Sequence, residues 1–104
     1  MLSFIKNIFK SKPPVDFKEL LKKGAQLIDV RTSDEFRTGH LKGAINIPLQ
    51  QLGSNLSKIR KDKPVITYCA SGMRSSAAKN MLMERGFGEV YNGGGFHNLQ
   101  NKIR

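Results

Sequence analysis

The sequence predicts a small α/β domain with a mainly parallel central sheet. Short apolar runs alternate with segments in which apolar residues recur at helical spacing, and Pro or Gly bounds the runs. The 104 residues have room for one domain, and 38% apolar content suffices for one modest core. In an open sheet of this kind, we expect a ligand site beyond the carboxyl ends of the strands.

The first 14 residues differ in pattern from the rest of the chain. Leu2, Ile5 and Phe9 share one helical face with lysines nearby, and Pro13 and Pro14 form a stiff joint. We interpret residues 1–14 as a short basic amphipathic segment with a Pro-Pro joint, and residues 15–104 as the domain. The segment is shorter than the roughly 20 apolar residues of a membrane span, and it lacks the pattern of a secretory signal. Packing on the domain and weak contact with a membrane surface both remain open.

Capping and stop signals divide residues 15–104 into alternating elements. Asp16 with Glu19 predicts the start of a first helix that Gly24 ends, and Thr32 or Ser33 caps a brief second one. The expected helices span residues 17–23, 49 to about 61, 75–85 and 96–103, and the brief second helix carries Asp34, Glu35 and Phe36 and is ended by Gly39. The expected strands span residues 27–30, 44–47, 65–68 and 90–91. We interpret Gly93–Gly95 as a loop before the last helix.

Composition limits the classes of function. The 18 Lys and Arg against 8 Asp and Glu give a net charge of +10, which favours anionic ligands, acidic partners or nucleic acid. The lysines are scattered rather than gathered with aromatic residues, so we expect no nucleic-acid partner. One cysteine makes no internal disulfide and is easiest to keep reduced in the cytoplasm, where we expect the protein. Without metal-ligand clustering or a Gly-x-x-x-x-Gly-Lys loop, we expect no metal and no cofactor.

The stretch CASGMRSS, Cys69 to Ser76, carries the strongest chemical signal. A thiol attacks as a thiolate, and a free cysteine with a pKa of about 8.5 is mostly protonated at neutral pH. Curled backbone N–H groups, the dipole of the next helix and the charge of Arg74 would all stabilise the anion, and Gly72 permits the curl by accepting positive φ. We therefore predict Cys69 as the nucleophile. The predicted substrate-binding residues are the rest of the loop, Ala70, Ser71, Gly72, Met73, Arg74 and Ser75.

Two other interpretations of this stretch are less consistent with its residues. A buried structural cysteine is common, but it needs neither the glycine nor the arginine. A tyrosine-phosphatase type of loop has Cys-x5-Arg, whereas Cys69 and Arg74 give Cys-x4-Arg. The smaller ring suits one sulfur atom carried on the cysteine better than a phosphoryl group, which disfavours a phosphatase or an arsenate reductase.

CASGMRSS resembles the active-site loop of single-domain rhodaneses, the thiosulfate sulfurtransferase-like proteins, in which Cys-x-x-Gly-x-Arg precedes a small residue. The stretch from Leu27 to Pro48 matches the N-terminal signature of that family, and NGGGF, Asn92 to Phe96, matches its C-terminal signature. The resemblance covers the chain from about Val15 to its end. One departure is Leu99, which stands near the place of a tryptophan that the family often carries.

The resemblance implies a rhodanese-like fold with a five-stranded, mainly parallel sheet flanked by helices. It also implies a sulfurtransferase that moves a sulfane sulfur from a small anionic donor such as thiosulfate to a thiol or cyanide acceptor through a Cys69 persulfide. The alternative is a sulfur-carrier or docking module for a specific acidic protein partner, with little free thiosulfate activity.

The other polar residues are assigned structural roles. No acid or base is needed beside Cys69, because sulfite leaves without protonation. We therefore interpret His40 and His97 as structural, and Asp29 with Arg31 as a salt bridge or loop anchor, with Glu35 in the same class. Because Met73 is neutral, Arg74 is the only cation of the loop, which predicts a weaker preference for thiosulfate than a loop with several cations would have.

Overall fold

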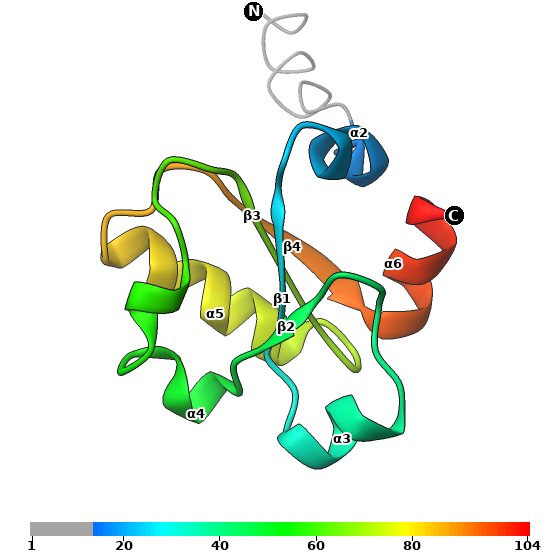
Figure 1. Ribbon diagram of the computed structural model, residues 1–104, viewed down its shortest axis with the longest axis horizontal. Helices are drawn as coiled ribbons and strands as arrows, with labels where there is room; N and C mark the ends of the chain where they lie inside the picture. The colour runs from blue at the N-terminus through cyan, green and yellow to red at the C-terminus, as the bar shows by residue number, and fades with distance from the viewer. Residues whose placement is uncertain (1–13) are drawn as a thin grey trace, which may run out of the picture.

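A computed structural model describes residues 14–104 as a parallel sheet with helices on both faces (Figure 1). The strands are β1 (Gln26–Asp29), β2 (Ile45–Asn46), β3 (Val65–Cys69) and β4 (Val90–Gly95). Their order across the sheet is β2-β1-β3-β4, and every pairing is parallel. The predicted α/β class with a mainly parallel sheet flanked by helices is therefore confirmed.

The expected number of strands is wrong by one. The sheet has four strands within residues 14–104, whereas the resemblance implied five. The four apolar runs that the sequence offers between its helices supply all four strands. Only residues 14–16 of the described chain precede the first helix, so no run is left there for a fifth strand.

The helices form two layers. They are α2 (Phe17–Lys22), α3 (Ser33–Thr38), α4 (Leu49–Leu52), α5 (Met73–Glu84) and α6 (Phe96–Ile103), with a 3₁₀ turn at Leu56–Lys58. α4 and α5 pack together on one face of the sheet, and α2 and α6 pack together on the other. α3 follows β1 at the carboxyl edge of the sheet, the edge where β3 also ends (Figure 1).

Local capping explains where two of these helices begin. Asp16 accepts a hydrogen bond from the backbone N–H of Glu19 at 3.0 Å and so caps α2. Thr32, rather than Ser33, caps α3, and its capping box is complete because the Glu35 side chain accepts from the Thr32 N–H.

Three predicted boundaries are wrong by more than one residue. The helix expected over residues 49–61 ends at Leu52, because the side chains of Ser54 and Asn55 donate to the Gln51 carbonyl and turn the chain. α5 begins at Met73 instead of Ser75, so Arg74 belongs to its first turn. The predicted loop Gly93–Gly95 is the end of β4.

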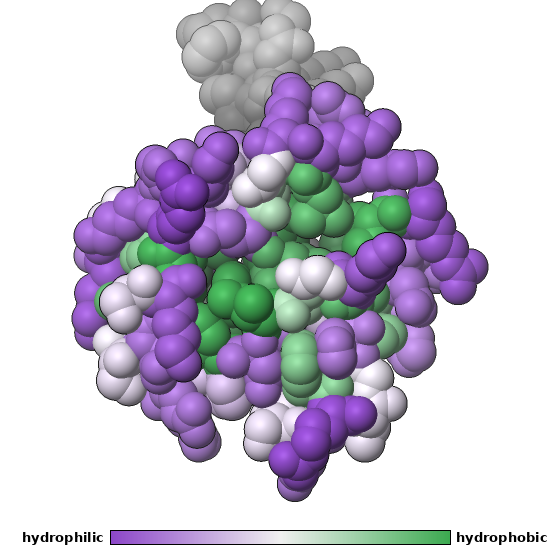
Figure 2. All heavy atoms as spheres, viewed as in Figure 1, coloured by the Kyte–Doolittle hydropathy of each residue, from purple (hydrophilic) through white to green (hydrophobic). Residues whose placement is uncertain are grey.

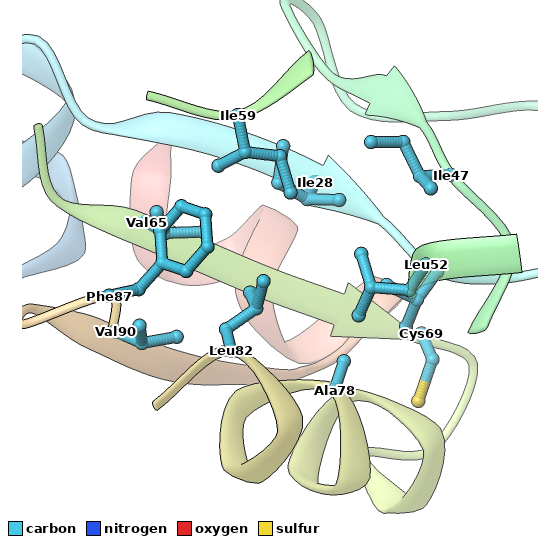
Figure 3. Packing of buried hydrophobic residues seen from close by; sticks show 11 residues of the cluster. Ile28, Ile47, Leu52, Ile59, Val65, Cys69, Ala78, Leu82, Phe87 and Val90 are labelled. Carbon is cyan, nitrogen blue, oxygen red and sulfur yellow. The ribbon is translucent and has the colours of Figure 1, made fainter. Parts of the chain in front are cut away.

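Each face of the sheet has its own hydrophobic core. Figure 3 shows the first, in which Ile28, Leu52 and Leu82 join the sheet to α4 and α5. The second joins Phe17, Tyr68 and Leu99 on the side of α2 and α6. In Figure 2, hydrophilic residues surround the visible face and apolar atoms occupy its middle. The two cores hold the carboxyl edge of the sheet in place from both sides.

The expectations for residues 1–13 lie outside the described residues. Within residues 14–104, every helix is too short or too polar to cross a membrane.

Candidate active site

Cys69 is the last residue of β3 and is fully buried. Its side chain lies at the end of the core cluster nearest the first turn of α5 (Figure 3). The sulfur accepts hydrogen bonds from the backbone N–H of Gly72 at 3.0 Å and of Ser75 at 3.4 Å. Two of the N–H groups that the sequence indicated therefore converge on the sulfur.

The backbone of Gly72 makes this convergence possible. The φ angle of Gly72 is +102°, a left-handed backbone conformation that residues with a Cβ rarely adopt. Gly72 is also the N-cap of the 12-residue helix α5. The Cys69 sulfur therefore lies at a helix N-terminus, where unpaired N–H groups and the helix dipole favour negative charge.

The glycines of β4 lie directly against the backbone of β3 and of the loop that follows Cys69. A Cβ on Gly95 would lie 2.6 Å from the carbonyl oxygen of Ala70, and a Cβ on Gly93 would lie 2.9 Å from that of Thr67. Gly95 also pairs in register with Cys69. Sequence reasoning treated Gly93–Gly95 as a loop requirement and missed this close approach, although the glycine run itself was the available signal.

These contacts lower the pKa of the Cys69 thiol below its usual value. Burial acts in the opposite direction and is the largest single influence, because it disfavours the thiolate. The side-chain hydrogen bond between the sulfur and the Ser75 hydroxyl, together with the bonds from the N–H groups of Ser75, Gly72 and Ser71, outweighs burial. The geometry therefore suits a nucleophilic sulfur.

Arg74 forms a bidentate ion pair with Glu35 of α3. Its two terminal nitrogens donate to the carboxylate oxygens at 2.7 and 3.1 Å. Arg74, and then the Thr32 backbone N–H, lower the pKa of Glu35 to about 2. The same pair raises the pKa of Arg74, with a smaller contribution from the nearby Cys69 sulfur. Glu35 thus has the structural role that the sequence indicated, but its partner Arg74 was not predicted.

The other predicted loop residues lie at different depths. Ala70, Ser71 and Met73 are exposed at the rim, with Met73 80% exposed, whereas Ser75 is fully buried against the sulfur. A small cavity of about 240 Å³ borders Ala70 and is also lined by Arg31, Thr38, Gly39, Phe96 and His97. It offers space for a small molecule beside the loop.

Asn92 also belongs to the site, although it was identified only as the first residue of the NGGGF signature and not as a site residue. Its Oδ1 lies 2.6 Å from the Ser75 hydroxyl and accepts from the Gly94 N–H at 2.9 Å. Its Nδ2 donates to the Gly72 carbonyl at 3.3 Å. Asn92 therefore contacts the loop from β4, the strand beneath it.

The remaining polar candidates support the fold around the site. Arg31 binds the buried Asp29 carboxylate with a shortest distance of 2.7 Å and also donates to the Gly39 carbonyl, which confirms the predicted salt bridge and anchor. His40 stacks on Phe36 with ring centroids 3.7 Å apart. Across residues 14–104, no group of three or more His, Cys, Asp or Glu side chains is placed to hold a metal ion.

Comparison with known proteins identifies relatives over most of the chain. A family model described as "Rhodanese-like domain" matches residues 13–102. "Uncharacterized protein YqhL" of Bacillus subtilis is 45% identical over 98 residues, which cover 93% of this chain and 77% of that protein. "Thiosulfate sulfurtransferase GlpE" of Pseudomonas savastanoi is 33% identical over 85% of this chain and 84% of that protein. The human single-domain sulfurtransferase TSTD1 superposes with a TM-score of 0.76 at 25% identity, covering 89% of this chain and 98% of that one.

Proposed function

Because the chain belongs to the rhodanese family and is a sulfurtransferase of the rhodanese type, we propose that it carries a sulfane sulfur as a persulfide on Cys69. The donor is a small anion such as thiosulfate, and the acceptor is a thiol or, in an assay, cyanide. One observation carries the proposal: the Cys69 sulfur is buried at the N-terminus of α5 and accepts backbone hydrogen bonds from Gly72 and Ser75.

The reaction proceeds in two displacements. The Cys69 thiolate attacks the outer sulfur of thiosulfate, a new S–S bond forms, and the old S–S bond breaks as sulfite leaves with its electron pair. The acceptor then attacks the terminal sulfur of the persulfide, and the Cys69 thiolate leaves. Each nucleophile is an anion, either the Cys69 thiolate, cyanide or the thiolate form of an acceptor thiol, and each leaving group departs as a stable anion. Neither displacement therefore transfers a proton.

The loop residues have distinct roles in this proposal. The N–H groups of Gly72 and Ser75 hold the negative sulfur, and the helix dipole adds to their effect. Ala70, Ser71 and Met73 form the rim that the donor passes. Arg74 attracts the anionic donor, although Glu35 already balances part of its charge.

We extend the proposal to the organisation of the chain. Residues 15–104 form the catalytic domain, and residues 1–14 are an added basic segment. A reducing compartment such as the cytoplasm would keep Cys69, the only cysteine of the chain, from forming a disulfide with another molecule.

Substitution of Cys69 tests this function. We expect wild-type protein to convert thiosulfate and cyanide to thiocyanate and sulfite, and Cys69→Ser to lose this turnover by at least about a thousandfold, because a serine hydroxyl is a far weaker nucleophile toward sulfur. Thiocyanate is measured colorimetrically, with Ser76→Ala as the matched control on the exposed side of α5. Turnover that persists in Cys69→Ser would contradict the assignment.

The Arg74–Glu35 pair favours a second candidate, a sulfur carrier that docks on an acidic protein partner. A cation that is already paired attracts free thiosulfate less strongly, so a protein-borne persulfide could be the better donor. This candidate predicts slow turnover with thiosulfate together with rapid loading of Cys69 from a protein persulfide. Comparable rates with both donors would exclude it.

A further inference from the structure

Three hydrogen-bond acceptors, one of them the Cys69 sulfur, lie close to the hydroxyl of Ser75, which has a single proton. The Oγ of the fully buried Ser75 lies 2.6 Å from Asn92 Oδ1, 3.1 Å from the Gly72 carbonyl oxygen and 3.4 Å from Cys69 Sγ. A serine hydroxyl has one proton and can donate it to only one of them at a time. The acceptor that receives it decides whether the sulfur faces an O–H proton or oxygen lone pairs.

The orientation of the Asn92 amide determines which acceptor that is. The backbone N–H of Gly94 points at the Asn92 side-chain atom 2.9 Å away. Because a backbone N–H can only donate, that atom has to be the amide oxygen, and the opposite flip would bring two donors together. The amide nitrogen then faces the Gly72 carbonyl, which is an acceptor. Ser75, at 2.6 Å from the same oxygen, has to supply the proton between them.

This arrangement suits a thiol better than a thiolate. With its proton on Asn92, the Ser75 oxygen presents lone pairs to Cys69 and can accept a hydrogen bond from the S–H. A thiolate needs donors instead, so the Ser75 hydroxyl has to rotate from Asn92 to the sulfur when the proton of Cys69 leaves. After this rotation Asn92 keeps the Gly94 N–H and the Gly72 carbonyl keeps the Ser76 N–H at 3.1 Å. The Ser75 and Asn92 oxygens, 2.6 Å apart, then have no proton between them and have to move apart, which is the cost that the thiolate has to offset.

We propose that Asn92 is a positioning residue that controls how readily Cys69 loses its proton, by competing with the sulfur for the hydroxyl proton of Ser75. The inference rests on the proposed role of Cys69 as the nucleophile. Asn92 acts through Ser75 and holds the resting sulfur closer to the thiol form. The same hydroxyl becomes a donor to the sulfur once a thiolate or persulfide has formed.

The charged groups around the sulfur are paired and are not altered by a change at Asn92. α5 contributes Arg74, which binds Glu35 of α3, and the end of β1 contributes Asp29, which binds Arg31. β4, from Val90 to Gly95, carries no charged side chain. A change in the protonation of Cys69 caused by substitution of Asn92 would therefore report the hydroxyl competition.

The test is the pH dependence of Cys69 alkylation by iodoacetamide. Cys69 is the only cysteine, so the rate reports one site. Asn92→Leu has a similar shape without polar atoms and frees the Ser75 hydroxyl for the thiolate. We expect a lower midpoint of the pH profile and about tenfold faster alkylation below the wild-type midpoint, the effect of one added hydrogen bond to an anion. Asn92→Asp keeps the acceptor and adds negative charge, so it should raise the midpoint and slow alkylation.

Ser75→Ala provides the matched background, because it removes the contested proton. There, Asn92→Leu should leave the alkylation profile unchanged. The proposal is overturned if Asn92→Leu alone keeps or raises the wild-type midpoint, or if its acceleration persists in Ser75→Ala. Asn92→Ala repeats the test should the leucine variant fold poorly, as monitored by thermal unfolding.

The readout separates this inference from the proposed function. Alkylation uses no sulfur donor, so an unchanged profile in Asn92→Leu contradicts the role of Asn92 and leaves persulfide transfer untouched. Conversely, a protein that shows the expected alkylation profiles but never loads sulfur on Cys69 would contradict only the proposed function.

Discussion

At the scale of single residues, Cys69 depends on backbone donors more than on a free cation. The N–H groups of Gly72 and Ser75 reach its sulfur directly, whereas the charge of Arg74 is shared with Glu35. These donors are fixed by the chain itself and need no reorganisation when negative charge develops on the sulfur. In the proposed reaction, Arg74 acts mainly on the anionic donor that approaches the rim.

Two substitutions separate the charge of Arg74 from its contact with Glu35. Arg74→Ala should reduce kcat/KM for thiosulfate about tenfold while changing turnover of an uncharged persulfide donor much less, because only the anionic donor loses an attractive charge. Glu35→Gln retains the cation and should keep the preference for thiosulfate. Steady-state rates with both donors measure this. Equal losses for both donors in both variants would show that Arg74 only stabilises the structure through its contact with Glu35.

At the scale of elements, Glu35 connects α3 to α5. It completes the capping box of α3 through Thr32 and also holds Arg74 in the first turn of α5. One carboxylate therefore fixes the start of α3 and its position beside the active-site loop.

The link predicts a defined pH dependence of stability. The pKa of Glu35 is lowered from 4.5 to about 2, so its stabilising contribution is complete above pH 4.5 and is lost as pH falls toward 2. We expect Glu35→Gln to have a lower Tm than wild type at neutral pH, and this difference to shrink across that interval. Thermal unfolding followed by circular dichroism measures it. A difference that stays constant down to about pH 2 would contradict the role of the ionised pair.

The glycines of β4 give a second prediction at this scale. In Gly95→Ala the new Cβ meets the Ala70 carbonyl at 2.6 Å, so the loop has to move away from the strand. Displacement of a reacting group by about 1 Å can cost a hundredfold in rate, and we expect a loss of sulfur transfer of about that size. Gly88→Ala is the control, since a Cβ there meets no atom within 4 Å. Wild-type turnover in Gly95→Ala would show that the close approach is not required.

At the scale of the whole molecule, local patterns predicted the elements better than the contacts between them. Apolar runs bounded by Pro or Gly located four strands, and Gly72 was identified as the left-handed residue of the loop. The prediction of a helix over residues 49–61 was wrong. It relied on the helical spacing of the leucines, but polar side chains after Gln51 end the helix locally.

The polar contacts between elements of the site could not be predicted from the sequence. Glu35 and Arg74 are 39 residues apart, and Ser75 and Asn92 are 17 apart. Spacing within a segment describes which side chains share a face of that segment. Which side chain of another element meets them depends on the tertiary packing, and that is visible only once the sheet order and the register of β3 with β4 are known.

Intact-protein mass spectrometry tests the central claim most directly. After incubation with thiosulfate and removal of small molecules, wild-type protein should gain about 32 Da, the mass of one sulfur atom, on Cys69. Cyanide should remove the added mass, and Cys69→Ser should never acquire it. An unchanged wild-type mass with thiosulfate and with other sulfane donors would contradict a persulfide on Cys69.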